Sequence, residues 1–118
     1  ALPTDPYFTT EQWHLTYYAA GNADPNANIK ADSAWSGSEP YGSPGIVVAV
    51  LDNGFQLNHP DLAASFLPGY DFFDGDTDPS PSDPVPSDPD NHGTAVAGII
   101  AAAANGTATV GGAPNCRI

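Results

Sequence analysis

The sequence predicts an α/β fold in which helices flank a mainly parallel sheet, because strand-like and helix-like segments alternate. Residues 45–51 form a continuous apolar run rich in β-branched side chains, which is typical of a strand buried on both faces. Residues 93–104 combine high helix propensity with small side chains, as in a buried helix packed closely against a sheet. Residues 113–118 resemble the start of a second strand. Since these segments cannot complete a sheet, we expect residues 1–118 to be one incomplete domain that a second chain completes.

Two short helices are predicted before the first strand. Residues 1–8 are Pro-rich and extended, and Thr9 or Thr10 can cap a helix over residues 11–18 that stops at Gly21. A second helix is expected over residues 29–35, ending at Gly37.

The region between the first strand and the long helix is less regular. Residues 58–62 predict a tight turn, and residues 70–73 have the composition of a short strand. Residues 74–91 form an Asp/Pro/Ser tract without hydrophobic periodicity, which is either disordered or ordered by ions. Asn105-Gly106 is expected to end the long helix.

The charge of the chain excludes several classes of partner. With 2 basic and 14 acidic residues, its formal net charge is −12. Binding to nucleic acid or to an anionic membrane surface is therefore not expected, and no apolar run approaches the length of a membrane span. The acidity predicts either a solvated surface or carboxylate clusters that hold hard cations.

The termini and the single cysteine bear on processing. Cys116 cannot form a disulfide within the chain, so we expect either a buried thiol or a bond to another chain. The chain starts at Ala1 and contains no methionine. This start predicts a mature N-terminus exposed by processing, and a chain trimmed at the same place would look identical.

Two side chains at the ends of core elements suggest nucleophilic catalysis. Asp52 follows the predicted strand directly, and His92 precedes the predicted helix beside Gly93. A carboxylate and the imidazole that it orients are two of the three groups needed for nucleophilic catalysis by a serine. The imidazole takes the serine proton near neutral pH. His14 and His59 lie in a short helix and a turn, where we expect structural roles.

Three motifs identify a family resemblance. Asp52-Asn53-Gly54, the turn Asn58-His59-Pro60-Asp61-Leu62 and residues 92–98 occur in order and at suitable spacing. Together they resemble the first half of the subtilisin-like (subtilase) catalytic domain. The resemblance implies a subtilisin-like fold and a serine endopeptidase that cleaves proteins or peptides, with Asp52 as triad aspartate and His92 as general base. Asn53 stands where many subtilases have Thr, Ser or Asp, a difference that leaves the triad chemistry intact.

The N-terminal residues narrow the resemblance and imply bound calcium. Residues 4–8 and 12–15 resemble the opening of kexin/furin-like and thermitase-like subtilases, and more loosely that of cyanobacterial calcium-dependent proteases. Carried over by position, one Ca²⁺ site would use the side chains of Asp5, Asp61 and Asn105 and the carbonyl groups of Ala103, Thr107 and Thr109. Carboxylates mixed with backbone carbonyls suit the six to eight oxygen ligands of calcium. The alternative for the loop is an ordinary Gly-rich turn.

A second calcium site is implied by the acidic run at residues 71–78. Asp71, Asp76 and Asp78 match positions where proprotein convertases bind calcium. Alternating carboxylates around a glycine can converge on one cation. The run lacks the distal glutamate and the flanking helices of an EF-hand. The alternative is a solvated acidic loop.

The triad serine is missing. No serine follows His92, and none lies in the Gly-Thr-Ser setting of the family. We therefore expect a two-chain protease, separated by autoprocessing or nicking, whose larger C-terminal chain carries the nucleophilic serine. The resemblance also implies a secreted or periplasmic protein.

Other functions remain open at this stage. A non-enzymatic calcium-binding or interaction module explains the acidic clusters but not the spacing of Asp52 and His92, and an inactive protease fragment would show the same motifs. A nucleotide-binding strand at residues 45–54 is set aside, because the GxGxxG fingerprint is absent.

Overall fold

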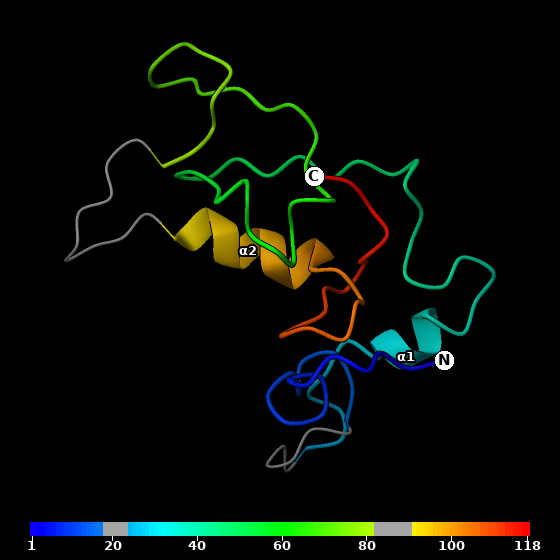
Figure 1. Cartoon of the computed structure of the whole chain (residues 1–118). Coiled ribbons are helices and arrows are strands. Elements are labelled where there is room, and N and C mark those ends of the chain that lie inside the picture. Colours follow the sequence, from blue (N-terminus) through cyan, green and yellow to red (C-terminus); the bar gives the residue numbers. More distant parts are fainter. Residues whose placement is uncertain (18–23, 82–90) are drawn as a thin grey trace.

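The computed structural model describes residues 1–17, 24–81 and 91–118, and these ranges contain two helices. Helix α1 is Ala31–Ala34, and helix α2 is His92–Ala101. Helix α2 crosses the middle of the molecule, with the N-terminal segment and α1 on one side and residues 45–81 on the other (Figure 1). In the described ranges, neither helix has the length and apolarity needed to cross a membrane.

The buried face of α2 is built from small residues. Gly93, Ala97 and Ala101 are buried along it. At its C-terminal end the chain folds back so closely that a Cβ atom added to Gly111 would lie 2.4 Å from the nitrogen of Ala101. The small side chains predicted for a closely packed helix therefore serve that purpose, although Ile99 on another face is 59% exposed.

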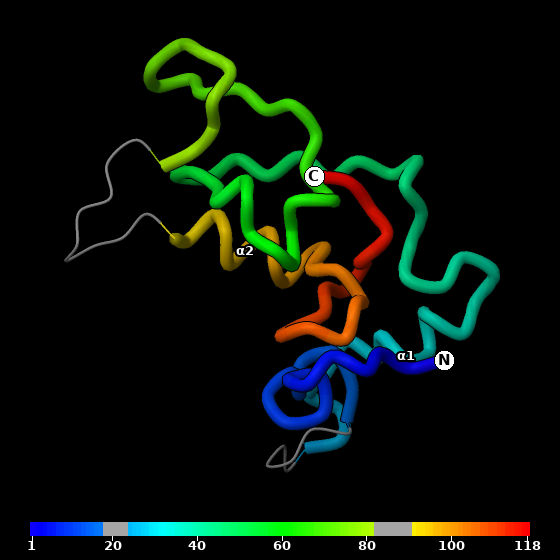
Figure 2. Tube along the Cα trace, in the orientation of Figure 1, coloured from blue at the N-terminus to red at the C-terminus, as the bar shows by residue number. Residues whose placement is uncertain are grey.

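The C-terminal segment satisfies the last carbonyl groups of α2, which have no partners within a helix. The nitrogens of Gly111, Gly112 and Ala113 donate to the carbonyls of Ala102, Ile99 and Ile100 at 2.8–2.9 Å. Figure 2 shows this return, drawn in orange and red, between α2 and the N-terminal segment. The return ties the end of α2 to residues 111–113, and the helix stops at Ala101, before the predicted break at Asn105-Gly106.

Two apolar clusters flank this centre. One contains Phe8, Leu15, Ala31, Trp35 and Val110 and joins the N-terminal segment to α1. The other lies between residues 50–66 and α2. It contains the buried side chains of Phe55, Leu62, Ala97 and Ala102, and the partly buried Val50, Leu57, Phe66 and Ile118 pack against them. Both clusters are small, and the described residues contain two helices and no named strand. The site described below is therefore positioned mainly by loops.

The predicted helix over residues 11–18 does not form at residues 11–17, and residues 18–21 lie outside the described ranges. Consecutive turns take its place, with the nitrogens of Glu11 and Gln12 both donating to the carbonyl of Tyr7. The Gln12 side chain instead reaches across the molecule to the backbone of Val110, donating at 2.7 Å and accepting at 2.9 Å. These long-range contacts outweigh local helix propensity.

The strand predicted over residues 45–51 is also different in the structure. The segment is extended but forms only an isolated parallel bridge, between Val47 and Arg117. Ile46, Val47 and Leu51 are 56%, 58% and 84% exposed, so burial on both faces is wrong for this structure. A strand becomes buried only when layers cover its two faces, and the described part of the chain provides no such layers here. The predicted strand character of residues 113–118 is confirmed only as far as this bridge.

Other predicted boundaries shift. Helix α1 is shorter than the predicted 29–35, because Lys30 before it adopts a left-handed φ of 55°. Residues 70–73 form no strand; a bridge between Asp71 and Asp76 closes a turn instead. The predicted turn at residues 58–62 is present. Of the Asp/Pro/Ser tract, residues 82–90 lie outside the described ranges.

Candidate active site

His92 and Asp52 form a hydrogen-bonded pair. His92 is the first residue of α2, and Asp52 follows the extended segment over residues 46–51. The Nδ1 atom of His92 lies 2.9 Å from both carboxylate oxygens of Asp52. Residues that are 40 positions apart in sequence are thus brought together in the arrangement that an acid–base pair requires.

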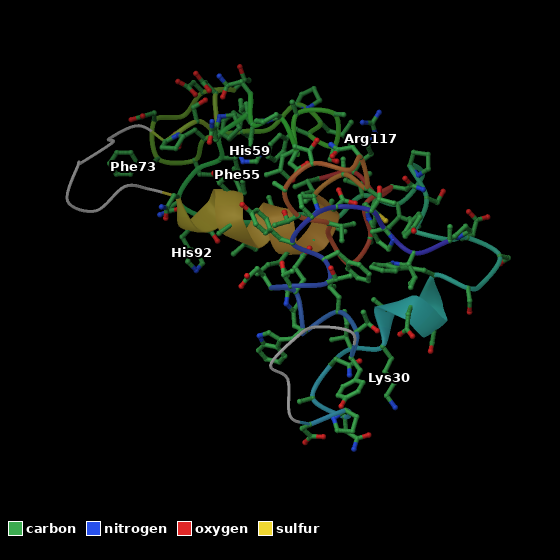
Figure 3. All side chains as sticks on the ribbon, turned by 60° about the horizontal axis from the view of Figure 1, so that its bottom comes forward. Lys30, Phe55, His59, Phe73, His92 and Arg117 are labelled. Carbon is green, nitrogen blue, oxygen red and sulfur yellow. The ribbon has the colours of Figure 1, made fainter. Side chains whose placement is uncertain are left out.

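The contact selects one tautomer of the imidazole. An ionised carboxylate can only accept hydrogen bonds, so Nδ1 of His92 carries the proton and Nε2 keeps its lone pair. The Asp52 side chain is 13% exposed, whereas that of His92 is 72% exposed. In Figure 3 the labelled His92 projects from the N-terminal end of α2, away from the ribbon. The ring can therefore receive a proton from a group that approaches this end of the helix.

Hydrogen bonds keep Asp52 ionised. The backbone nitrogen of Asn53 donates to its Oδ1 at 2.8 Å, and Nδ1 of His92 donates to the same carboxylate. These two bonds, the first more than the second, lower the pKa of the Asp52 carboxyl below its ordinary value. The carboxylate is therefore available throughout the pH range in which a histidine changes charge.

The loop at Asp52 and the start of α2 touch at the level of the backbone. A Cβ atom on Gly93 would lie 2.4 Å from the carbonyl oxygen of Gly54 and 3.0 Å from Cβ of Asp52, so only glycine fits. Gly54 itself has a φ of 131°, which favours glycine. The two glycines of the motifs thus allow the close approach that brings His92 to Asp52.

Two polar side chains that sequence reasoning did not assign to this site join the same segments. The Oδ1 atom of Asn53 accepts the N–H of Gly93 at 3.1 Å, and Oγ1 of Thr94 accepts the N–H of Gln56 at 2.9 Å. Their position next to Asp52 and His92 in the motifs was the only sequence signal, since a side-chain bond to a distant backbone has no local pattern.

Asp5 and Asp61, predicted as calcium ligands, are deeply buried and face the same loop. They are 3% and 2% exposed. Oδ1 of Asp5 accepts the N–H groups of Asn105 and Gly106, both at 3.1 Å, and Oδ2 of Asp5 is buried without a hydrogen-bond partner in the described part of the chain. A buried carboxylate oxygen without a partner is unfavourable unless a cation or another donor meets it.

The remaining predicted ligands of this set surround Asp61. Its Oδ1 accepts the amide of Asn105 at 3.1 Å, and its Oδ2 accepts the N–H of Thr109 at 3.2 Å. Its backbone carbonyl accepts the N–H of Ala103, and the N–H of Thr107 donates to Oδ1 of Asn105. The structure thus brings together the segments that carry all six predicted residues. In this arrangement the side-chain oxygen of Asn105 accepts the N–H of Thr107 at 2.9 Å.

The carboxylates of the second acidic run serve local turns. Oδ1 of Asp71 accepts the N–H groups of Phe73 and Asp74, and Oδ1 of Asp76 accepts the N–H of Asp78. Hydrogen bonds from Ser80 lower the pKa of the Asp78 carboxyl. Within residues 1–17, 24–81 and 91–118, no three acidic, histidine or cysteine side chains gather closely enough to hold a metal ion. Calcium binding by Asp71, Asp76 and Asp78 stays a prediction.

The other two histidines lie away from the Asp52–His92 pair. His59 accepts the N–H of Asp61 through Nδ1 at 3.2 Å, so it stabilises the predicted turn as a hydrogen-bond acceptor. His14 is half-buried, its Nε2 has no hydrogen-bond partner in the described ranges, and burial lowers its pKa. Cys116 is a buried free thiol.

Comparisons with known proteins agree with this geometry. The sequence profile of the Subtilase family (peptidase S8) matches residues 43–118. Human furin is 45% identical over 98% of this chain, and the thermophilic serine proteinase of Bacillus sp. strain AK1 is 43% identical over 87%. Human proprotein convertase subtilisin/kexin type 4 is 42% identical over 99%. The chain spans 14%, 23% and 15% of these three relatives, respectively.

A solved structure gives the same result at the level of the fold. The Aeromonas sobria serine protease, crystallised in complex with a chaperone, is 42% identical with a TM-score of 0.56. The match covers 65% of this chain and 12% of that chain. The predicted fold class, the N-terminal portion of an α/β fold, is confirmed at this coarse level, although the described part of the chain contains little regular secondary structure.

Proposed function

Because the chain belongs to the subtilase family, in its kexin/furin-type branch, we propose that it supplies the aspartate and the histidine of a serine endopeptidase. The observation that carries this proposal is the 2.9 Å contact between Nδ1 of His92 and the carboxylate of Asp52. It leaves Nε2 of an exposed imidazole as the proton acceptor. A non-enzymatic calcium-binding module would have no need of this pair.

The proposed reaction is acyl transfer through a covalent acyl-enzyme. Nε2 of His92 takes the proton of a serine hydroxyl while the serine oxygen bonds to the carbonyl carbon of the scissile peptide. The imidazolium then gives this proton to the leaving amine as the peptide C–N bond breaks. Asp52 holds the ring and stabilises its positive charge during both steps. Water, activated by the same imidazole, releases the acyl group.

The serine belongs, in this proposal, to a larger C-terminal chain of the same protease. The exposed apolar side chains of Ile46, Val47 and Leu51 support this, because several large apolar side chains exposed within one short segment favour packing against further polypeptide. The partner would cover residues 46–51 and present its serine to His92. Proteins or peptides in a secreted or periplasmic setting would be the substrates.

Calcium is proposed to hold the N-terminal segment in place. Oδ2 of Asp5, which is buried without a hydrogen-bond partner among the described residues, and the buried carboxylate of Asp61 fit a hard cation, since Ca²⁺ prefers carboxylate and carbonyl oxygens. Asn105 and the carbonyls of Ala103, Thr107 and Thr109 would complete the ligand set. The ion would supply structural stabilisation and take no part in proton transfer.

A fluorophosphonate probe tests the proposed catalysis. We expect denaturing intact-mass analysis of the labelled protease to show the 12.1 kDa chain without adduct and a larger chain with a single adduct. The His92→Ala protease should lose both labelling and peptide hydrolysis while its calcium-dependent stability stays.

Three outcomes contradict parts of this proposal. Labelling of a single continuous chain would reject the two-chain arrangement but keep the catalysis. Finding only the 12.1 kDa chain without adduct would favour the calcium-binding module. Equal loss of activity and calcium-dependent stability in His92→Ala would reject the role of His92 as a general base.

A further inference from the structure

The geometry of the Asp52–His92 pair depends on contacts between two segments that no sheet connects. The extended segment before Asp52 has its backbone bridge at Val47, where Val48 donates to the carbonyl of Arg117 at 2.8 Å. This anchor lies five positions before Asp52. The position of the carboxylate relative to α2 therefore depends on the apolar cluster that contains Phe55 and Ala97, and on bonds that cross between residues 52–56 and the first turn of the helix.

Two such cross-links stand beside the pair itself. Asn53 accepts the N–H of Gly93 through Oδ1 at 3.1 Å, immediately next to both Asp52 and His92. Thr94 accepts the N–H of Gln56 through Oγ1 at 2.9 Å, farther along each segment. In the first bond a side chain of the segment over residues 52–56 accepts a backbone N–H of the helix. In the second bond a side chain of the helix accepts a backbone N–H of that segment.

The Asn53 side chain accepts a backbone N–H that has no carbonyl partner within the helix, that of Gly93. The first N–H groups of a helix lack carbonyl partners within it, and Gly93 is the second residue of α2. Gly93 is also buried, with its Cα against the carbonyl of Gly54 and Cβ of Asp52. Loss of the Asn53 oxygen would leave a buried donor without a partner at the point where the two segments touch.

We propose that Asn53 is a positioning residue, whose side-chain oxygen holds Gly93 and thereby keeps the imidazole of His92 in line with the carboxylate of Asp52. The inference rests on the proposed function, because it assigns the bond a role in proton transfer. Asn53 does not itself exchange a proton. The side-chain amide of Asn53 is neutral, so it adds no charge beside the Asp52 carboxylate. That carboxylate also accepts the backbone N–H of Asn53.

Kinetics of the whole protease test this role. Asn53→Ala should lower kcat about ten- to one hundredfold with little change in KM, because a small misplacement of the base slows the chemical step without weakening binding. Asn53→Gln, which keeps the amide but displaces its oxygen by one methylene, should likewise lower kcat with little change in KM. Asn53→Asp keeps the acceptor in place and should retain most of kcat, while the added negative charge moves the acidic limb of the kcat/KM profile to higher pH.

Thr94→Val is the matched control. It removes the other cross-link between the same segments while keeping the side-chain shape. We expect a lower melting temperature with unchanged kcat and an unchanged pH profile. If Thr94→Val and Asn53→Ala lose kcat equally, Asn53 merely holds the segments together and the proposal is wrong. A rise in KM at constant kcat for Asn53→Ala would instead make Asn53 a substrate-contacting residue.

A spectroscopic measurement separates this inference from the proposed function. The Nδ1 proton of His92, shared with Asp52, should give a downfield proton NMR resonance in the native protease and in Asn53→Asp. It should broaden in Asn53→Ala and Asn53→Gln, whether or not the protease reacts with the serine probe. An unaltered resonance in both variants would overturn the positioning role even if the enzyme is active.

Discussion

At the scale of single residues, hydrogen-bond partners decide what each titratable group can do. His92 shares its Nδ1 proton with Asp52, so its second nitrogen is available for chemistry. His59 uses a ring nitrogen to accept the N–H of Asp61 and so supports a turn. Half-buried His14 has a ring nitrogen with no partner in the described ranges. Three residues of one type therefore have different roles, and neighbours rather than residue type assign them.

His14 predicts a pH dependence of stability. Burial lowers its pKa below 6.5, so at pH values between the folded and unfolded pKa the unfolded chain binds the proton more tightly. Its stabilising contribution is present above pH 6.5 and is lost as the pH falls through that interval. The His14→Gln protease should therefore lose less stability than the native protease between pH 7 and pH 5. Thermal unfolding at several pH values measures this difference.

The control for this experiment is His59→Gln, which changes another histidine outside the active site. If the His14→Gln and native proteins respond identically to acid, His14 does not contribute to the pH dependence.

At the scale of elements, α2 determines the site because its glycines and alanines permit backbone contact on the core face. Gly93 meets the loop at Asp52, and Ala101 meets Gly111 at the other end. A helix with larger side chains at these positions would stand farther from both segments. The histidine at its start and the loop after its end, which is proposed to bind calcium, are thus placed by the same packing.

Gly93→Ala tests this packing. The added Cβ would lie 2.4 Å from the carbonyl of Gly54, so a backbone must move, and we expect a loss of about 1–3 kcal/mol in the free energy of unfolding together with reduced activity. Chemical denaturation and peptide hydrolysis provide the two measurements.

Gly98→Ala is the matched control on the same helix. A Cβ there has no atom within 4 Å, and alanine favours a helix by about 1 kcal/mol relative to glycine. We expect equal or higher stability with unchanged activity. Equal destabilisation by both substitutions would mean that close packing at Gly93 is not the cause.

At the scale of the whole molecule, buried carboxylates tie distant segments together. Asp5 bonds to the backbone of residues 105 and 106, and Asp61 bonds to Asn105 and Thr109. The N-terminal segment, the turn at residues 58–62 and the loop after α2 therefore meet at one place. Negative charge gathered in a buried place is unfavourable without a counter-charge, which a cation would provide.

Calcium removal is expected to lower the melting temperature of the protease. A ligand that binds only the folded state stabilises it by mass action, by about 2.7 kcal/mol when its free concentration is 100 times Kd. Calorimetry with and without a chelator measures the change. Asp5→Asn should melt at a lower temperature and respond little to the chelator, whereas Glu11→Gln, a change at an exposed acidic residue of the same segment, should respond like the native protein.

Two results would contradict this assignment. A melting temperature that does not change with chelator would exclude calcium stabilisation. A full chelator response in Asp5→Asn would move the ion elsewhere, for instance to the acidic run at residues 71–78.

The sequence by itself determined the family, the motif residues Asp52 and His92, the small-residue helix and the acidic character of the chain. These features depend on local residue order. A strand-like run that ends in a carboxylate, or a histidine before glycine and small residues, can be recognised without knowing which distant residues it contacts. It also predicted which distant residues would meet around Asp61, because the resemblance carried that pairing.

Only the tertiary structure decided which predicted elements form and how the pair is held. The helix over residues 11–17 gave way to turns because Gln12 bonds to Val110, almost one hundred positions away. The predicted strand over residues 45–51 forms only an isolated bridge, and several of its apolar side chains stay exposed because burial requires layers from outside the segment. The bond from Gly93 to Asn53 joins a side chain to a distant backbone. Such contacts depend on atoms that are far apart in sequence, so no local pattern of residues records them.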